Sequence, residues 1–168
     1  VATPAGKVLF RRDLTASDAY SYRVWADRGG RAAPWDSTFG TGFTPHPTGL
    51  RDGSKPSPVL SQLVRLQNVP FSKNDPWLPP TATEASGNNV RAYADLVAPD
   101  GYGAGDLNLV PTSPKTFDYP YDPAVAPTVS PWARRAVLTQ FFYTINYLHD
   151  TFYDAGWDEK SFNPQSDN

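Results

Sequence analysis

The chain has 168 residues, a formal net charge of −2, and neither cysteine nor methionine. The charge balance shows no basic excess, which argues against a general nucleic-acid binder, and the absence of cysteine excludes disulfides and thiolate metal sites. No run of about 18 apolar residues occurs, so we expect no membrane span. Aromatic residues make up 14% of the chain, beside 18 prolines and 12 glycines, so large rings in a turn-rich chain should supply much of the core.

The N-terminal third is predicted to contain two short strands. Residues 7–12 follow a turn, and residues 20–26 alternate in polarity, with Tyr20, Tyr22 and Val24 on one face. The polar linker between these strands leads us to place a domain boundary or processing region near residues 16–19. The chain begins with Val1 and lacks methionine, so we expect a processed piece of a longer precursor.

The middle of the chain is predicted to be rich in loops. Residues 27–58 read as loop, because glycine pairs and a Pro-His-Pro sequence break any periodicity. Residues 59–66 fit a short strand or a helical turn, and residues 75–80 should be extended, with Trp77 against the core. Two more strands are predicted at residues 90–96, the most regular alternation in the chain, and at residues 116–121, where Pro120 favours an edge position.

One long helix is predicted over residues 131–155. Ser130 is suited to the N-cap, Pro131 to the first turn, and Gly156 to the left-handed residue that ends a helix. Apolar residues recur every three or four positions, at Val137, Phe141, Ile145, Leu148 and Phe152. A second apolar line runs beside them, so we expect this helix to be buried between two layers. The predicted fold class is α+β: a mostly β N-terminal region with long loops, packed on one long buried helix.

The two histidines are the first candidates for a metal or catalytic site. His46 stands between two prolines in a loop and should be an ordinary exposed side chain. His149 lies in the helix, but Tyr153 occupies the position where a His-Glu-x-x-His zinc helix carries its second imidazole. We therefore expect His149 and Asp150 to be hydrogen-bonded inside the buried helix, anchoring it to strands or to another domain.

Carboxylates gather in two places, as calcium binding or acid/base chemistry would require. Asp150, Asp154, Asp158 and Glu159 lack the spacing of an EF-hand, so capping or solvation near the helix end is expected instead. The loop Asp100–Asp106 lacks the ligand alternation of a calcium loop. No Gly-x-Ser-x-Gly elbow and no phosphate-binding glycine motif occurs. We therefore assign no catalytic, cofactor-binding or metal-binding residue to this chain.

The long helix and the residues after it resemble a segment of the fungalysin family of secreted zinc metallopeptidases. That family carries the pattern (aromatic-Tyr)-x-x-Asn-x-x-His-Asp-x-x-Tyr-x-x-Gly-(aromatic)-x-Glu-x-x-x-Asn. The matching positions here are Phe142, Tyr143, Asn146, His149, Asp150, Tyr153, Gly156, Trp157, Glu159 and Asn163. The departure is Pro164, where many members have Phe; it concerns the loop that leaves the helix.

Looser similarity extends over most of the chain. Residues 69–77 and 83–93 look like the start of the family's mature domain, and residues 6–14 are similar to the last strand of its PepSY-type propeptide. The resemblance implies that residues 1–16 end a propeptide and that residues 17–168 form the N-terminal portion of a secreted metallopeptidase domain. An alternative role for residues 1–16 is that of an inhibitory remnant near the cleft.

The resemblance also implies a zinc endopeptidase that hydrolyses protein or peptide substrates with a metal-activated water. The family's zinc ligands lie in a His-Glu-x-x-His helix and a later Glu, and neither occurs before Asn168. We therefore expect zinc to be bound by a downstream segment, this chain to be inactive alone, and the rest of the peptidase to pack on the helix at residues 131–155. Calcium is the second cofactor that the resemblance allows.

The competing hypothesis is a secreted, non-catalytic, β-rich binding module. It would grip a polysaccharide or peptide with exposed aromatic side chains, for which the candidates are Trp25, Trp35, Trp77 and Tyr102. The helix discriminates between the two hypotheses, because its apolar surface is too wide for a small module to cover.

Overall fold

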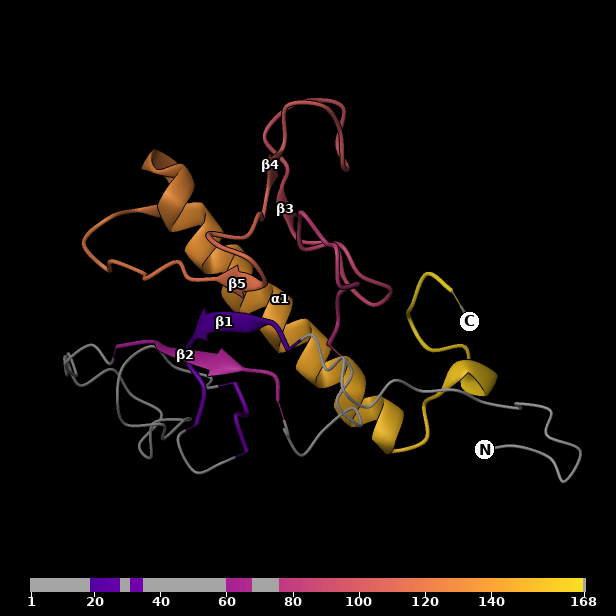
Figure 1. Ribbon diagram of the computed structural model, residues 1–168. Coiled ribbons are helices and arrows are strands. Elements are labelled where there is room, and N and C mark those ends of the chain that lie inside the picture. Colours follow the sequence, from indigo (N-terminus) through magenta and orange to yellow (C-terminus); the bar gives the residue numbers. More distant parts are fainter. Residues whose placement is uncertain (1–18, 28–30, 35–59, 68–75, 168) are drawn as a thin grey trace, which may run out of the picture.

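The computed structural model describes residues 19–27, 31–34, 60–67 and 76–167 (Figure 1). In this part of the chain the helix α1 (Pro131–Asp154) packs along small sheets, which confirms the predicted α+β class. The strands are β1 (Ser21–Val24), β2 (Gln62–Arg65), β3 (Tyr93–Ala94), β4 (Leu107–Asn108) and β5 (Thr116–Phe117). Two 3-10 turns, η2 (Pro127–Val129) and η3 (Glu159–Ser161), stand before and after the helix. The predicted strand at residues 7–12, the proposed boundary at 16–19, His46 and Trp35 lie outside or at the edge of the described residues.

Strand β1 is the middle of a three-stranded sheet with the order β2-β1-β5. Tyr22 stands opposite Val64 in the antiparallel pair with β2, and opposite Phe117 in the parallel pair with β5. The predicted alternation is confirmed, because Tyr20, Tyr22 and Val24 are all buried. The open choice at residues 59–66 resolves to a strand.

The strand predicted at residues 90–96 is much shorter than expected. Only Tyr93 and Ala94 form β3, which pairs with β4, and Leu96 is exposed. Beyond Ala94 the carboxylate of Asp106 accepts hydrogen bonds from the backbone N–H groups of Leu96 and Val97, so a side chain replaces the strand ladder there. The two strands form a hairpin that projects from the body of the chain (Figure 1).

The strand predicted at residues 116–121 is also short, but its position and its buried face are confirmed. Strand β5 lies at an edge of the sheet, as Pro120 suggested, and Phe117 and Tyr119 are buried. Tyr119 donates its hydroxyl hydrogen bond to the carbonyl of Val110 at 2.8 Å.

Both predicted ends of the helix are confirmed. The Ser130 hydroxyl accepts a hydrogen bond from the N–H of Ala133, which caps the first turn. At the other end Gly156 has φ +103°, its N–H bonds to the carbonyl of Tyr153, and the N–H of Trp157 bonds back to Phe152. This pair of bonds is a Schellman motif, and the rings of Trp157 and Phe152 make the apolar contact that accompanies it, with centroids 5.9 Å apart.

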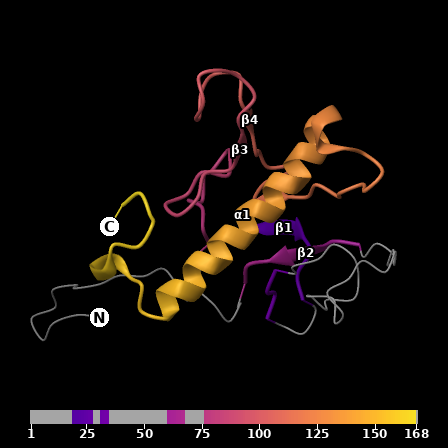
Figure 2. The same ribbon diagram turned by 180° about the vertical axis from the view of Figure 1, so that it is seen from behind.

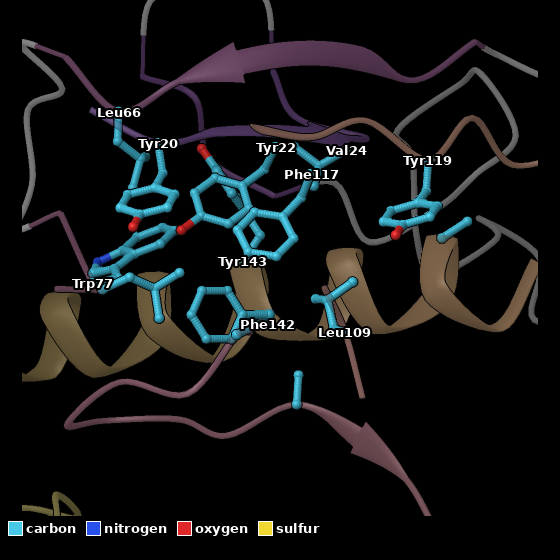
Figure 3. Close-up of a cluster of buried hydrophobic side chains, with 14 of the residues drawn as sticks. Tyr20, Tyr22, Val24, Leu66, Trp77, Leu109, Phe117, Tyr119, Phe142 and Tyr143 are labelled. Atoms are coloured by element: carbon cyan, nitrogen blue, oxygen red, sulfur yellow. The ribbon is translucent and has the colours of Figure 1, made fainter. Parts of the chain in front are cut away.

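The core is a cluster of aromatic rings between α1 and the sheet (Figure 3). Tyr22 stacks on Phe117 with centroids 5.3 Å apart and contacts Phe142 of the helix at 5.6 Å. Trp77 is 3% exposed and meets Tyr143 edge-on at 5.2 Å, so its predicted place against the core is confirmed. The high aromatic content therefore supplies burial where the strands are too short to carry many aliphatic side chains.

Within the part of the chain that the structure describes, one side of α1 is covered and the other is exposed. The sheet lies on one side of the helix, and Figure 2 views the helix from the other side. The covered side carries mostly small or polar residues, namely Ala133, Ala136, Thr139, Phe142, Tyr143, Asn146 and Asp150. The large apolar residues of the opposite side are between 42% and 60% exposed; these are Phe141, Ile145, Leu148 and Phe152.

Among the described residues a single layer covers the helix, and the second layer expected for it, the rest of the peptidase, is not part of this chain. We call the four exposed residues Phe141, Ile145, Leu148 and Phe152 the apolar stripe. Among the described residues no helix is long and apolar enough to cross a bilayer.

Candidate functional site

A network of polar side chains crosses the C-terminal half of α1. The indole Nε1 of Trp77 donates to Oδ2 of Asp150 at 2.5 Å, and His149 Nδ1 lies 3.3 Å from Oδ1 of the same carboxylate. The side chains of His149 and Asp150 are only 9% and 3% exposed. The carboxylate can only accept, so it favours the His149 tautomer with hydrogen on Nδ1. The expected hydrogen bonding is confirmed, and the element anchored is the loop at Trp77.

The same network holds the segment after the helix. Asn163 Nδ2 lies 3.3 Å from Nε2 of His149 and donates to Oε1 of Gln165 at 2.8 Å. Residues 166 and 167 are bound in turn to Asn88, through the N–H of Ser166 at 2.9 Å and the N–H of Asp167 at 2.8 Å. Residues 156–167, which we call the tail, therefore turn back from the helix end towards the loop that precedes β3 (Figure 1).

A close backbone approach fixes the loop side of this network. Trp77 has φ +63°, and a Cβ added to Gly87 would lie 2.0 Å from the Trp77 carbonyl oxygen. Only glycine fits there, because any side chain would collide with backbone. Gly87 and Asn88 therefore place the Trp77 indole and the tail on the same end of the helix.

Two acceptor atoms in this region are buried and lack a hydrogen-bond partner: Oδ1 of Asn146 and Oδ1 of Asn163. The Nδ2 atoms of both amides are paired, that of Asn146 to the Phe142 carbonyl at 2.8 Å. Both residues belong to the pattern that carries the resemblance stated above.

The acidic residues beyond the helix serve structural roles. Tyr153 donates to both carboxylate oxygens of Glu159, at 2.9 and 3.1 Å, and this bond is the largest cause that raises the pKa of Tyr153. The pKa of Glu159 is lowered, first by a backbone N–H and then by the Tyr153 hydroxyl. Asp158 caps η3 by accepting from the N–H of Lys160. Asp154 is exposed whereas Asp150 faces Trp77, so the structure does not bring these two carboxylates together.

The residues described by the structure contain no group of three or more His, Asp or Glu side chains that could hold a metal ion. In the loop at residues 100–106 the Asp106 carboxylate accepts from three backbone N–H groups, of Leu96, Val97 and Gly103. Asp95 likewise accepts from Gly101. These carboxylates stabilise the β3–β4 hairpin.

A hollow of about 220 Å³ lies at the C-terminal end of α1, and three of the four residues of the apolar stripe form part of its lining. Its lining residues are Asn89, Ile145, Leu148, His149, Phe152, Trp157, Asn163 and Pro164. The sequence periodicity singled out Ile145, Leu148 and Phe152 but predicted them to be buried. Nothing local in the sequence indicates that Asn89 and Pro164 meet them.

The described aromatic residues that are candidates for a binding surface, Trp25, Trp77 and Tyr102, are not gathered on one element. Trp77 is in the core, and Trp25 is partly buried with its ring edge-on to Tyr121 at 5.4 Å. Tyr102 is exposed on the β3–β4 hairpin, beneath the Arg91 guanidinium at 3.4 Å. These three side chains lie on different elements, and Trp35 lies outside the described residues.

Comparison with known proteins identifies the family of this chain. Residues 50–168 match the model of the fungalysin metallopeptidases. The chain is 35% identical over 127 residues to a probable extracellular metalloproteinase 4 of Trichophyton verrucosum, a match that covers 73% of this chain and 18% of the relative. It is 33% identical over 154 residues to an extracellular metalloproteinase 4 of Arthroderma gypseum, covering 88% of this chain and 22% of the relative.

The chain thus spans about a fifth of the length of these curated relatives. No solved structure matched it. The family match covers well over half of the chain, including α1, the tail and the loop at Trp77. The chain therefore belongs to the fungalysin metallopeptidase family.

Proposed function

We propose that the chain is the N-terminal portion of the peptidase domain of a secreted, zinc-dependent endopeptidase that cleaves protein or peptide substrates. In this proposal residues 1–16 are the end of the propeptide, and residues 17–168 form scaffold and one wall of the substrate cleft. The family membership supports the reaction class, and the relatives' names, extracellular metalloproteinases, support secretion.

The observation that carries this proposal is the apolar stripe of α1. Four large apolar side chains on one face of a single helix are half exposed, in a chain whose relatives are several times longer. Contiguous exposed apolar surface of this kind marks an interaction site. We propose that the rest of the peptidase packs on this face of the helix.

Zinc and the catalytic residues belong, in this proposal, to the segment that follows residue 168. In metallopeptidases zinc activates the water that attacks the peptide carbonyl. The described residues of this chain do not offer a ligand set, since His149 is fully engaged with Asp150 and Asn163. We also propose no calcium ligand among the described residues.

Two measurements test the proposal. Reading the gene beyond Asn168 should reveal a His-Glu-x-x-His sequence within a few dozen codons, and its absence would refute the peptidase. The isolated 168 residues should not hydrolyse casein with added zinc, so zinc-dependent hydrolysis by this chain alone would show that the active site is misplaced.

A non-catalytic binding module remains the second candidate function. The two candidates predict opposite behaviour of the apolar stripe in the isolated chain. If the stripe normally docks on the rest of a peptidase, the free chain should bind a hydrophobic dye or self-associate. A monodisperse monomer that unfolds cooperatively and ignores the dye would favour the module.

A further inference from the structure

We propose that the hollow at the C-terminal end of α1 is a preformed seat for one large, uncharged apolar side chain of the segment that follows residue 168. This inference rests on the proposed function, because its occupant belongs to the rest of the peptidase. The added claim is that one place on the helix, the hollow, receives a particular side chain of the docking segment.

The walls of the hollow are apolar and held in place. Ile145, Leu148 and Phe152 follow one another at helical spacing on the exposed side of α1. Trp157 forms a further wall, and the Schellman motif with its contact to Phe152 holds it there. Because these side chains are already held in place, they lose little conformational freedom when a partner binds. The hollow is therefore suited to hold a single inserted side chain.

The polar lining of the hollow indicates an uncharged occupant. Nδ1 of His149 faces Asp150 and Nε2 faces Asn163, so both ring nitrogens already have partners. Asn163 Nδ2 also donates to Gln165. The Oδ1 atom of Asn163 has no partner but is already shielded from solvent, so an apolar occupant would not remove water from it. A charged side chain entering the hollow would lose its water without gaining a counter-charge, whereas an apolar side chain has no charge to desolvate.

The path of the tail indicates where the occupant comes from. Ser166 and Asp167 are bound to Asn88, and the next residue, Asn89, lines the hollow. A chain that continues beyond residue 168 therefore starts near the rim of the hollow. The matched relatives have about four-fifths of their length outside the matched region, which supplies such a chain.

In the experiment, residues 1–168 and the part of the same gene product that follows them are produced as two separate chains and then mixed. Binding is measured by titration for the wild type, Leu148→Asp and Leu148→Trp, with folding checked by circular dichroism. Leu96→Asp is the matched control, because Leu96 is 47% exposed on the β3–β4 hairpin and Leu148 is 42% exposed in the hollow.

We expect Leu148→Asp to weaken association at least about tenfold, and Leu96→Asp to leave it unchanged. Leu148→Trp is the sharper variant, because it keeps the surface apolar but fills the hollow. It should also weaken association if the hollow receives a side chain. Docking should also protect the fluorescence of Trp157 from quenching by acrylamide. The signal of Trp157 is obtained by subtracting the fluorescence of Trp157→Phe from that of the wild type.

Three outcomes would overturn the inference, and they differ in what else they overturn. If Leu148→Trp binds as tightly as wild type, the seat is refuted while docking on the helix stands. If the wild-type chain does not bind the downstream chain, the docking in the proposed function fails too. If Leu148→Asp abolishes self-association but not downstream binding, the occupant is a second copy of this chain.

Discussion

The indole of Trp77 and the carboxylate of Asp150 are hydrogen-bonded at 2.5 Å although 73 residues separate them in sequence. Asp150 is 2% exposed, so its carboxylate depends on such donors in place of water. The bond joins the loop before the hairpin to the helix at the point where His149 also contacts the carboxylate. The loop, the helix and the tail thereby share one buried network.

Trp77→Phe should destabilise the chain more than loss of ring volume alone explains. The substitution keeps an aromatic ring but removes one buried hydrogen bond to the Asp150 carboxylate, and loss of such a bond to a charged group costs about 1–3 kcal/mol. Urea unfolding measures the change. Trp132→Phe is the control, because Trp132 is exposed and its Nε1 bond to the Pro120 carbonyl is longer, at 3.3 Å. Equal losses in the two variants would contradict the role given to the Trp77 bond.

Gly87→Ala should be strongly destabilising. The added methyl would lie 2.0 Å from the Trp77 carbonyl oxygen, so the loop carrying the indole must shift, at a cost of about 1–3 kcal/mol or more. Gly103→Ala is the control, since the nearest atom to its Cβ position is 3.9 Å away. Thermal unfolding should separate the two variants, and a neutral Gly87→Ala would mean that the approach of the two backbones is looser than described.

The β3–β4 hairpin should loosen in acid. The N–H of Leu96 is the largest cause that lowers the pKa of Asp106 below its ordinary value of 3.8; partial burial opposes it, and the N–H groups of Gly103 and Val97 add to it. A carboxylate whose pKa is lowered by folding stabilises the folded state above its ordinary pKa, and this contribution is lost as pH falls through the lower, folded value.

Amide exchange of Leu96 and Gly103 between pH ~5 and ~2 measures this loss, after correction for intrinsic exchange rates. Asp106→Asn cannot titrate and should abolish the acid-dependent part. The idea fails if the two proteins show the same pH dependence.

Tyr143 should ionise only when the fold opens. Burial is the largest cause that raises its pKa above the ordinary value of 10, and the negative charge of Asp27 adds to it. Its hydroxyl donates to the carbonyl of Ala32 at 2.5 Å. A raised acid pKa stabilises the folded state below the ordinary pKa, and that contribution is lost as pH rises above it.

An ultraviolet titration of tyrosinate should therefore show one late phase that coincides with unfolding. Tyr143→Phe should remove that phase and leave the phases of the other tyrosines in place. A late phase that survives the substitution would assign it to another residue.

The helix ends could be predicted from the sequence because each depends on a few neighbouring residues. Ser130 and Gly156 have the side chain and the backbone freedom that a cap requires, whatever packs around them. The helix faces could not be assigned in the same way. The covered side takes Ala136, Thr139 and Asn146 because the sheet lies close to it, and the larger apolar side chains are left facing outwards.

The candidate site was only partly predictable for a related reason. Hydrogen bonding of His149 and Asp150 follows from their place among apolar residues, but their partners Trp77 and Asn163 come from distant segments. The length of β3 depended on a carboxylate 12 residues past its end, since Asp106 takes the N–H groups that a longer strand would have used. Such choices are decided by tertiary contacts, which residue periodicity does not contain.

Under the proposed function, the central position of β1 limits where a precursor could be cut. In the described sheet β2 and β5 each pair with β1 and not with each other. Tyr22 of β1 also contacts Phe117 and Phe142 in the core. A cut within residues 20–24 would take out the middle strand of this sheet and part of the core. If the proposed propeptide is removed from the N-terminus, the cut must therefore fall before β1 for this sheet to survive.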